Sequence, residues 1–320
     1  MNSNVNKVLI IGGSGQIGYY LSKFLIKKNE IYISTRDKKS KKIKKLKKTF
    51  KKIKIIKLNI FDKKNIIYNI KKIKPYYIFY LAGQSSVEYS FKKKKETLLS
   101  NYLGCKNVLD SIIELNIDIK FFNASSSEIY GNNKKIITIN SKKEPVSPYG
   151  KAKLKSFNLV KYYRKKYNLK LYNGIIFNCE SNDRPKNYVF PKICIAALLA
   201  KKQIDKGEIK KFEFGNINIK RDWGWCEEYV NFIWQNIQKK PKDFMVATGK
   251  SFFLYEIIKC AFEQLNLNWL NHIVINKKFF RRKEIFLVKT KIINAKKKII
   301  KSNGKDIIIK MLKFYKINHF

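Results

Sequence analysis

Cysteine, histidine and long apolar runs are all scarce in this chain of 320 residues, and each shortage excludes a class of protein. The five cysteines stand far apart without a C-x-x-C pair, so we expect free thiols in a reducing compartment and no disulfide framework. The two histidines have no spacing that would form a zinc site. No apolar run approaches the about 20 residues that a membrane-spanning helix needs. Glycines cut off the apolar run at 8–11, so we expect no signal peptide and a cytoplasmic location.

Acidic residues are also few, because 23 Asp and Glu accompany 70 Lys and Arg and give a formal net charge of +47. Such a charge is typical of proteins that bind nucleic acids. The lysines are spread over almost every segment, together with many Ile, Asn, Phe and Tyr, the residue set of A/T-rich codons. We therefore attribute the charge to composition and expect no nucleic-acid partner, although the basic surface would attract an anionic nucleotide.

Apolar strand patterns and amphipathic helix patterns alternate along the chain. The strand patterns cover residues 7–11, 31–35, 53–58, 76–81, 117–122, 169–177 and 244–249. The helix patterns include residues 38–52, 97–115, 149–167, 193–201 and 251–265. This alternation predicts an α/β fold with a doubly wound parallel sheet of the Rossmann type. We expect residues 1–177 to form the dinucleotide-binding domain and residues 178–320 a smaller α/β substrate-binding part, intertwined with the first.

A glycine-rich loop with the sequence G-G-S-G-Q-I-G, residues 12–18, lies between the first strand and the first helix. Its G-x-x-G-x-x-G spacing is a variant of the dinucleotide-binding fingerprint. Glycines let the backbone approach a pyrophosphate, and the helix N-terminus stabilises the negative charge. We predict cofactor contacts from Gly12, Ser14, Gly15, Gln16, Ile17 and Gly18.

The end of the second strand indicates which dinucleotide binds. An acid at this position binds the ribose 2′-hydroxyl of NAD, whereas an arginine suits the 2′-phosphate of NADP. The chain has Arg36 here, so we predict NADP. The next two strand ends point to the same crevice and add Asn59, Ile60, Leu81, Ala82, Gln84 and Ser85 to the predicted cofactor site.

A group of hydroxyls and one acid follows the fifth strand, as S-S-S-E at residues 125–128, and Tyr149 and Lys153 follow on a predicted helix. The i,i+4 spacing places Tyr149 and Lys153 on one helical face. A lysine cation favours the phenolate of a tyrosine whose ordinary pKa is about 10. Ser126 can orient a substrate oxygen and Glu128 can move a second proton, so the pattern predicts an acid–base site.

The glycine loop, the S-S-S-E group and the Tyr149–Lys153 pair together resemble the extended short-chain dehydrogenase/reductase family. Three stretches resemble the GDP-mannose 4,6-dehydratase family more specifically, namely N-G-I-I-F-N-C-E-S at 173–181, R-D-W-G at 221–224 and D-F-M-V-A-T-G at 243–249. Phe280 and Arg281 with Glu284 are similar to the late substrate motif of that family.

This resemblance implies a hydro-lyase that converts GDP-D-mannose into GDP-4-dehydro-6-deoxy-D-mannose, a step that opens GDP-fucose biosynthesis. It implies catalytic roles for Ser126, Glu128, Tyr149 and Lys153, with Lys153 also holding the cofactor. Arg184 would reach the cofactor as well. The GDP moiety would be held by Asn178, Lys192, Arg221, Arg281 and Glu284. We also expect a homo-oligomer, either a dimer or a tetramer.

Three positions depart from the family pattern. Cys179 replaces a histidine, Asn59 replaces an acid near the adenine, and Glu96 aligns with a tyrosine near the cofactor. Two alternatives stay open. One is a nucleotide-sugar epimerase or a 4-keto-sugar reductase of the same family. Elimination of water needs a base at C5, such as Glu128, whereas 4-epimerisation does not. The other is a basic cofactor-binding scaffold or RNA-binding protein.

Overall fold

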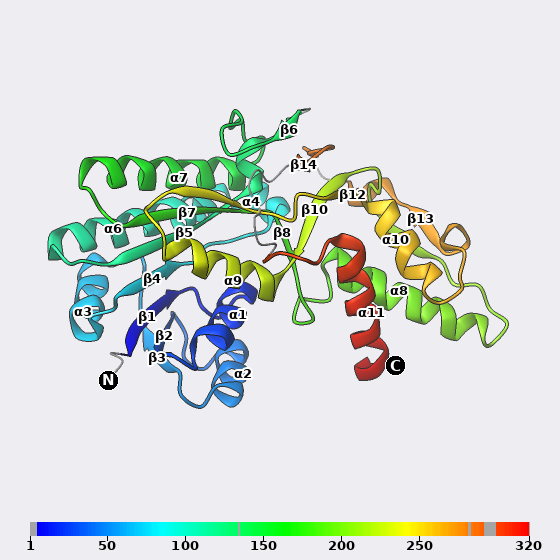
Figure 1. The fold of residues 1–320 in the computed structure, drawn as a ribbon. Helices are drawn as coiled ribbons and strands as arrows, with labels where there is room; N and C mark the ends of the chain where they lie inside the picture. Colours follow the sequence, from blue (N-terminus) through cyan, green and yellow to red (C-terminus); the bar gives the residue numbers. More distant parts are fainter. Residues whose placement is uncertain (1–4, 134, 281–282, 291–298, 320) are drawn as a thin grey trace. The chain divides into compact units, whose positions relative to one another are not determined.

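The computed structural model describes residues 5–133, 135–280, 283–290 and 299–319, and the chain forms two compact units (Figure 1). Unit 1 consists of Met1–Gly131, Lys142–Ile176 and Val230–Val246. Unit 2 consists of Asn132–Ser141, Phe177–Tyr229 and Ala247–Phe320. Residues 230–246 therefore belong to unit 1, to which they supply one strand. The assignment of cofactor binding to residues 1–177 and of substrate binding to 178–320 stays a prediction.

Unit 1 is built on a seven-stranded parallel sheet. Its strands are β1 (Asn6–Ile11), β2 (Asn29–Thr35), β3 (Lys54–Lys57), β4 (Tyr77–Tyr80), β5 (Lys120–Ser126), β7 (Leu171–Ile176) and β11 (Asp243–Val246). Their order is β11-β7-β5-β4-β1-β2-β3, and all neighbouring pairs are parallel. The order runs outward in both directions from β1 and β4, as in a doubly wound fold, so the predicted Rossmann-type class is confirmed.

Helices cover both faces of this sheet (Figure 1). They are α1 (Gln16–Leu25), α2 (Lys41–Thr49), α3 (Lys63–Ile73), α4 (Val87–Lys92), α5 (Lys94–Leu98), the π turn η1 (Leu99–Leu103), α6 (Gly104–Leu115), the 3-10 turn η2 (Ser127–Tyr130), α7 (Pro148–Lys166) and most of α9 (Cys226–Ile237). On the face under α3, α6 and α7, Val108 and Val160 share a core with Phe121. On the other face, Trp234 of α9 stacks on Phe79. Apolar side chains on both faces explain the near-continuous apolar strands.

Several predicted elements of unit 1 have different bounds in the structure, and for two of them hydrogen bonds and strand pairing explain the difference. The helix predicted over 97–115 is interrupted by η1, where Asn101 Nδ2 donates to the carbonyl oxygens of Thr97 and Gln84 at 2.9 and 3.0 Å. The strand predicted over 117–122 begins at Lys120 and continues to Ser126, because its serines pair with β7. Tertiary pairing thus extends a strand beyond its apolar residues.

Unit 2 contains three small sheets. The strands β8 (Asn178–Glu180), β10 (Lys220–Trp225) and β12 (Ser251–Phe253) form a sheet in the order β12-β10-β8, while β9 (Phe212–Phe214) pairs with β13 (Ile273–Ile275) and β6 (Ile136–Ile137) pairs with β14 (Lys289–Thr290). Its helical elements are α8 (Val189–Ile204), α10 (Leu254–Glu263), α11 (Gly304–His319) and the 3-10 turns η3 (Trp269–Asn271) and η4 (Lys277–Phe279). The helix predicted over 251–265 begins later than expected, because residues 251–253 pair with β10.

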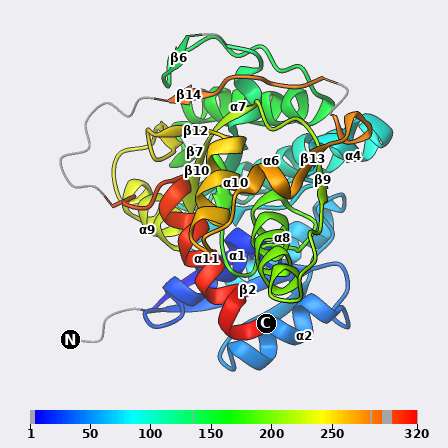
Figure 2. The same ribbon diagram turned by 90° about the vertical axis from the view of Figure 1, so that its right-hand side faces the viewer.

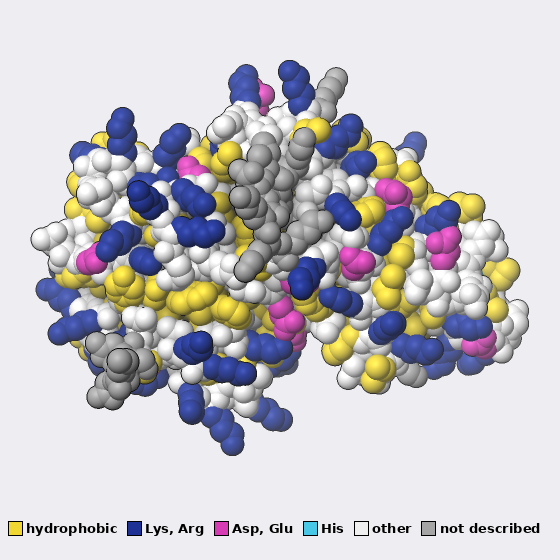
Figure 3. Space-filling model, in the orientation of Figure 1, with side chains coloured by type: hydrophobic (Ala, Val, Ile, Leu, Met, Phe, Trp, Pro, Cys, Tyr) yellow, Lys and Arg dark blue, Asp and Glu magenta, His cyan; other side chains and the backbone are white. Residues whose placement is uncertain are grey.

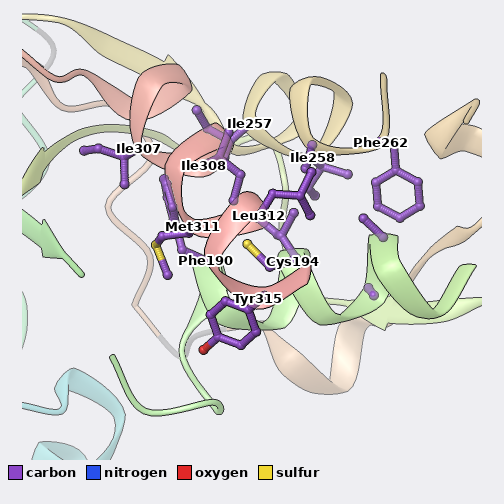
Figure 4. Packing of buried hydrophobic residues seen from close by; sticks show 14 of the residues in the cluster. Phe190, Cys194, Ile257, Ile258, Phe262, Ile307, Ile308, Met311, Leu312 and Tyr315 are labelled. Carbon is purple, nitrogen blue, oxygen red and sulfur yellow. The ribbon is translucent and has the colours of Figure 1, made fainter. Parts of the chain in front are cut away.

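The core of unit 2 lies between α8, α10 and α11, which pack side by side (Figure 2). Figure 4 shows Cys194 of α8, Ile258 of α10 and Leu312 of α11 converging on the same apolar interior. Burial of these side chains stabilises the unit by about 1.5–3 kcal/mol for each large one.

The lysines and arginines are distributed over the face shown in Figure 3 instead of gathering in one place. This distribution agrees with a compositional origin of the charge. Within the described ranges, no helix combines the length and the apolar character that crossing a membrane requires. The same residues contain no group of three His, Cys, Asp or Glu side chains placed to hold a metal ion.

Candidate active site

The glycine loop of unit 1 packs its backbone directly against the end of β4. Gly12 has a φ of +83°, and an added Cβ would lie 2.6 Å from Ala82 Cα, so only glycine fits there. The loop is also held by Ser34, whose Oγ accepts a hydrogen bond from the Gly12 N–H at 3.3 Å. Gly15 instead leaves room for a side chain, because an added Cβ would make an ordinary van der Waals contact with the Gly12 carbonyl oxygen at 3.7 Å.

The start of α1 suits an anion. The helix has no side-chain N-cap and no acidic residue in its first turn, so it brings no carboxylate of its own to its backbone N–H groups and positive dipole end. Ser14, Gln16 and Ile17 are half-buried around this turn, and Gly18 packs on the Gly13 carbonyl. These residues fit the pyrophosphate of a dinucleotide.

The ends of β2 and β3 carry three predicted cofactor residues. Arg36 is exposed directly after β2. Asn59 is exposed after β3, but its Oδ1 accepts a hydrogen bond from the Phe61 N–H at 3.1 Å within the loop. Ile60 is buried, and its carbonyl oxygen accepts a hydrogen bond from Asn107 Nδ2 at 2.9 Å. Of these three residues, Arg36 is the one whose side chain carries a charge that could bind a phosphate.

The loop after β4 carries the other predicted cofactor contacts. Leu81 and Ala82 lie against the glycine loop. The Gln84 side chain is held inside unit 1, because its Nε2 donates to Thr97 Oγ1 at 2.9 Å. Ser85 is exposed. Gln84 thus orders this loop in the structure, while its contact with a cofactor stays a prediction.

The predicted catalytic acid and hydroxyl lie at the end of β5. Ser126 is the last residue of the strand, and its Oγ accepts a hydrogen bond from the Glu128 N–H at 3.3 Å. Glu128 lies in η2, against which the first turn of α7 packs closely. An added Cβ on Gly150 would lie 2.6 Å from the Glu128 carbonyl oxygen. Gly150 therefore allows Tyr149, its neighbour in α7, to approach η2.

The predicted tyrosine–lysine pair lies in the first two turns of α7. This helix begins with Pro148, and Ser147 Oγ caps it by accepting from the Gly150 N–H at 3.0 Å. Lys153 Nζ lies 5.8 Å from the centroid of the Tyr149 ring and donates to the Ala124 carbonyl oxygen at 2.8 Å. The structure thus brings the four predicted catalytic residues to one end of unit 1, and their catalytic roles stay a prediction.

Burial lowers the pKa of Lys153 from its usual 10.5 to about 8. The cause is loss of water around the ammonium group, and the nearby Cys105 thiol partly opposes it. Cys105 is fully buried in α6, and burial raises the pKa of its thiol to about 12. Lys153 therefore exchanges its proton much closer to neutral pH than an exposed lysine does.

The lowered pKa of Lys153 predicts a dependence of stability on pH. Between pH 8 and 10.5 the unfolded chain binds more protons at this position than the folded chain does, so stability contributed by the site rises with pH. We expect the unfolding free energy of the wild type, relative to that of Lys153→Met, to increase across this interval. Urea unfolding at several pH values measures it. A constant or falling difference would contradict the lowered pKa of Lys153 in the folded chain.

The predicted cofactor residue Arg184 lies in unit 2. Its Nε is 3.5 Å from Glu180 Oε2, and its guanidinium carbon is 3.8 Å from the ring centroid of Tyr188. Glu180 is almost fully buried, and burial raises its pKa to about 7, against the opposing effect of Arg184. The carboxylate and the aromatic ring together restrict where the Arg184 guanidinium can point.

Two predicted substrate residues of unit 2 contact each other. Arg221 Nη2 and Glu284 Oε1 form a buried ion pair at 3.0 Å. Asn178 is half-buried at the start of β8. Lys192 Nζ donates to the Glu213 carbonyl oxygen at 2.6 Å, and burial lowers its pKa. Arg281 lies outside the described residues.

Asp222 was not singled out in the sequence, although it stands beside Arg221 in the R-D-W-G stretch. It is fully buried and accepts hydrogen bonds from the Thr248 and Gly249 N–H groups at 3.0 and 2.8 Å and from the Thr290 hydroxyl. These contacts tie β10 to β14 and to the loop before β12. The sequence signal for this buried acceptor is an acid that stands between an arginine and a tryptophan in R-D-W-G.

The fold is shared with solved structures of low sequence identity. Pal from Bacillus thuringiensis matches with a TM-score of 0.81 at 19% identity, covering 97% of this chain and 99% of Pal. UDP-glucose 4-epimerase from Thermotoga maritima matches with a TM-score of 0.80 at 19% identity, covering 97% of this chain and 99% of the epimerase. These likenesses show that the chain has the same Rossmann-type fold as these two proteins.

The sequence comparisons identify the family within this fold. The family model described as GDP-mannose 4,6 dehydratase matches residues 9–300. The relative from Drosophila melanogaster with that name is 31% identical over 88% of this chain and 78% of its own length, and the relative from Homo sapiens is 31% identical over 92% and 86%. The chain belongs to the GDP-mannose 4,6-dehydratase family, so the resemblance found in the sequence is confirmed.

Proposed function

We propose that this chain is a lyase that removes water from GDP-D-mannose and forms GDP-4-dehydro-6-deoxy-D-mannose. The observation that carries the proposal is the packing of Glu128 against the first turn of α7, which bears Tyr149, in a member of the dehydratase family. Elimination of water needs an acid–base group at C5 in addition to a base at the 4-hydroxyl, and these two side chains supply both.

The residues of unit 1 divide the proton transfers. When bound, NADP would supply the nicotinamide that holds the hydride from C4 of the sugar until it is given back at C6. Tyr149 takes the proton of the 4-hydroxyl, which Ser126 orients, and Lys153 favours the phenolate. Glu128 then removes the proton at C5 and delivers a proton to the C6 hydroxyl, which leaves as water. After C6 has been reduced, the Tyr149 hydroxyl gives its proton to C5, which restores the phenolate.

NADP is the proposed cofactor because a cation is exposed at the predicted ribose end of the site. Arg36 is exposed after β2, and a cavity of about 440 Å³ lies beside the loop that follows β3. The cavity is lined by Phe61, Lys92, Lys93, Lys94, Lys95, Glu96 and Leu99. Phe61 follows Ile60, and Leu99 precedes Ser100, whose Oγ accepts from the Gln84 N–H at 3.3 Å. The guanidinium of Arg36 would stabilise a 2′-phosphate at the end of β2, and the lysines of the cavity would attract the anionic cofactor to unit 1.

Replacing Arg36 by alanine is expected to reduce the preference for NADP over NAD by about 10- to 100-fold, the value of a charge-assisted phosphate contact of about 1.5–3 kcal/mol. Affinity for both dinucleotides can be measured by calorimetry on the purified protein. Lys38→Ala, an exposed cation two residues away, is the control. If Arg36→Ala keeps the wild-type preference for NADP, other residues recognise the 2′-phosphate. If the wild type itself binds NAD more tightly, the proposed cofactor is wrong.

Substrate binding is proposed for unit 2 through Asn178, Lys192, Arg221, Arg281 and Glu284, because arginine and lysine side chains match diphosphate. The proposal includes a homo-oligomer, a cytoplasmic location and a role at the start of GDP-fucose biosynthesis. The oligomer and the pathway role rest on family membership, and the location rests on the scattered free cysteines.

The deciding experiment incubates the purified protein with GDP-mannose and catalytic NADP. We expect mass spectrometry to find a product lighter by one water, without net reduction of the cofactor. An isomer of unchanged mass would instead indicate an epimerase of the same fold. Unchanged sugar together with salt-sensitive RNA binding would favour the basic binding protein.

A further inference from the structure

Four polar side chains form a hydrogen-bonded chain beneath α7 in unit 1, and we call them the amide clamp: Asn123 of β5, Asn173 of β7, Asp243 of β11 and Arg164 of α7. Asn123 Nδ2 donates to Asn173 Oδ1 at 2.9 Å. Asn173 Nδ2 donates to Asp243 Oδ1 at 3.0 Å, and Arg164 Nη2 donates to the same oxygen at 2.6 Å. The clamp thus crosses three strands and ends on the helix.

The two asparagines occupy positions where the sheet is otherwise apolar. They are directly opposed in the register of β5 and β7, and they are 1% and 0% exposed. Two residues earlier in each strand, the opposed pair is Phe121 and Leu171. Burying amides costs free energy unless all their hydrogen bonds are made, so an apolar pair would be the simpler way to stabilise this sheet. The amides therefore indicate a need for specific geometry.

The clamp fixes α7 at two places. Asn173 Nδ2 also donates to the Phe157 carbonyl oxygen at 3.1 Å, and Arg164 Nε donates to the Leu171 carbonyl oxygen at 2.7 Å. Each residue of a helix advances about 1.5 Å and turns about 100°, so a slip by one residue would break both bonds. The hydrogen bonds thus set both the rotation and the axial position of α7 on the sheet.

The clamp also reaches the surroundings of Lys153. Asn123 directly precedes Ala124, whose carbonyl oxygen accepts the Lys153 Nζ hydrogen bond. Asn123 Oδ1 is 4.0 Å from the Cys105 Sγ, the thiol that interacts with Lys153. The backbone that receives Lys153 and the helix that carries it are therefore held by one network.

We propose that the amide clamp is a positioning device for catalysis, which holds α7 in the one register that places Lys153 at the Ala124 carbonyl and Tyr149 beside η2. The inference rests on the proposed function, because the chemical roles of Tyr149 and Lys153 belong to it. The clamp residues act through these two side chains and do not contact the reacting atoms.

The test is a double variant, Asn123→Leu with Asn173→Leu. Replacing both amides by apolar groups of similar size avoids leaving one of them unsatisfied, and Arg164 keeps its bond to Asp243, so the variant is expected to fold. We expect kcat for dehydration to fall by about 10- to 100-fold, as for a misplaced catalytic group. KM should stay close to that of the wild type, because substrate contacts are unchanged.

Asn69→Leu is the matched control, because Asn69 is also a buried asparagine of unit 1 but its Nδ2 donates to the carbonyl oxygens of Asn65 at 2.8 Å and of Lys57 at 3.4 Å, in α3 and β3 and not in α7. It should lower the melting temperature and leave kcat unchanged. Wild-type kcat in the folded double variant would overturn the proposal. If the double variant does not fold, Arg164→Met is used instead, since it keeps both amides and loses the tie to Leu171. Unchanged kcat there would likewise refute the clamp.

A second measurement separates this inference from the proposed function. The ¹³Cε shift of Lys153, assigned with Lys153→Met, reports its titration without any substrate. A displaced helix would expose the ammonium, so the pKa in the double variant should rise from about 8 toward 10.5, while Asn69→Leu should not change it. A wild type that leaves GDP-mannose intact would refute the function alone. An unshifted titration in the double variant would refute the clamp.

Discussion

Replacing Glu128 by glutamine is expected to abolish the loss of water from GDP-mannose. Glutamine keeps the size of the side chain, and the backbone N–H that donates to Ser126 Oγ is unaffected, so the fold of η2 should persist. It cannot remove the C5 proton, however. The loss of a positioned general base is worth about 10²- to 10⁴-fold in rate. Mass spectrometry of the sugar nucleotide after prolonged incubation measures the result.

Deuterated water sharpens this test. The wild-type product should carry solvent deuterium at C5, because the Tyr149 hydroxyl that protonates C5 bears deuterium taken from the exchanged 4-hydroxyl of the sugar. The sugar left by the variant should stay unlabelled at C5. Glu88→Gln is the control, since its carboxylate is exposed in α4 with 77% of the side chain accessible. Full activity of Glu128→Gln would show that another group acts at C5 and would return the epimerase alternative to consideration.

Gly12→Ala is expected to lower the stability of unit 1, whereas Gly15→Ala is expected to lower its affinity for the dinucleotide. An alanine at residue 12 would place Cβ 2.6 Å from backbone atoms of Ala82, at a φ of +83°. The left-handed conformation alone costs about 1–2 kcal/mol, and the overlap adds to it, so the protein without cofactor should melt at a lower temperature. Calorimetry with and without NADP measures both stability and affinity.

Gly15→Ala serves as the matched substitution, because its Cβ would make only an ordinary contact with the Gly12 carbonyl oxygen at 3.7 Å and its backbone has no positive φ. Stability without cofactor should stay near that of the wild type. Affinity for the dinucleotide should fall, because the methyl group occupies the space proposed for the pyrophosphate. Wild-type affinity in Gly15→Ala would place the pyrophosphate elsewhere, and wild-type stability in Gly12→Ala would contradict the close packing on β4.

Local patterns were sufficient to predict the layered framework. The glycines of residues 12–18, the apolar strands and the spacing of Tyr149 and Lys153 are short-range features, and short-range backbone geometry decides what they form. The same patterns failed where a polar side chain acts over distance. The helix over 97–115 was predicted as continuous, because nothing in its apolar spacing shows that Asn101 bonds to the loop after β4.

The sequence by itself determined the class of fold, the family and the residues available for chemistry. Only the tertiary structure decided which side chains meet. Asn123 and Asn173 stand 50 residues apart, and Arg221 and Glu284 stand 63 apart, yet each pair is in direct contact. The pKa of Lys153 depends on burial by β5 and α6, which no local pattern describes. Hydrogen bonding and desolvation are set by neighbours in space, and the folded chain alone defines those neighbours.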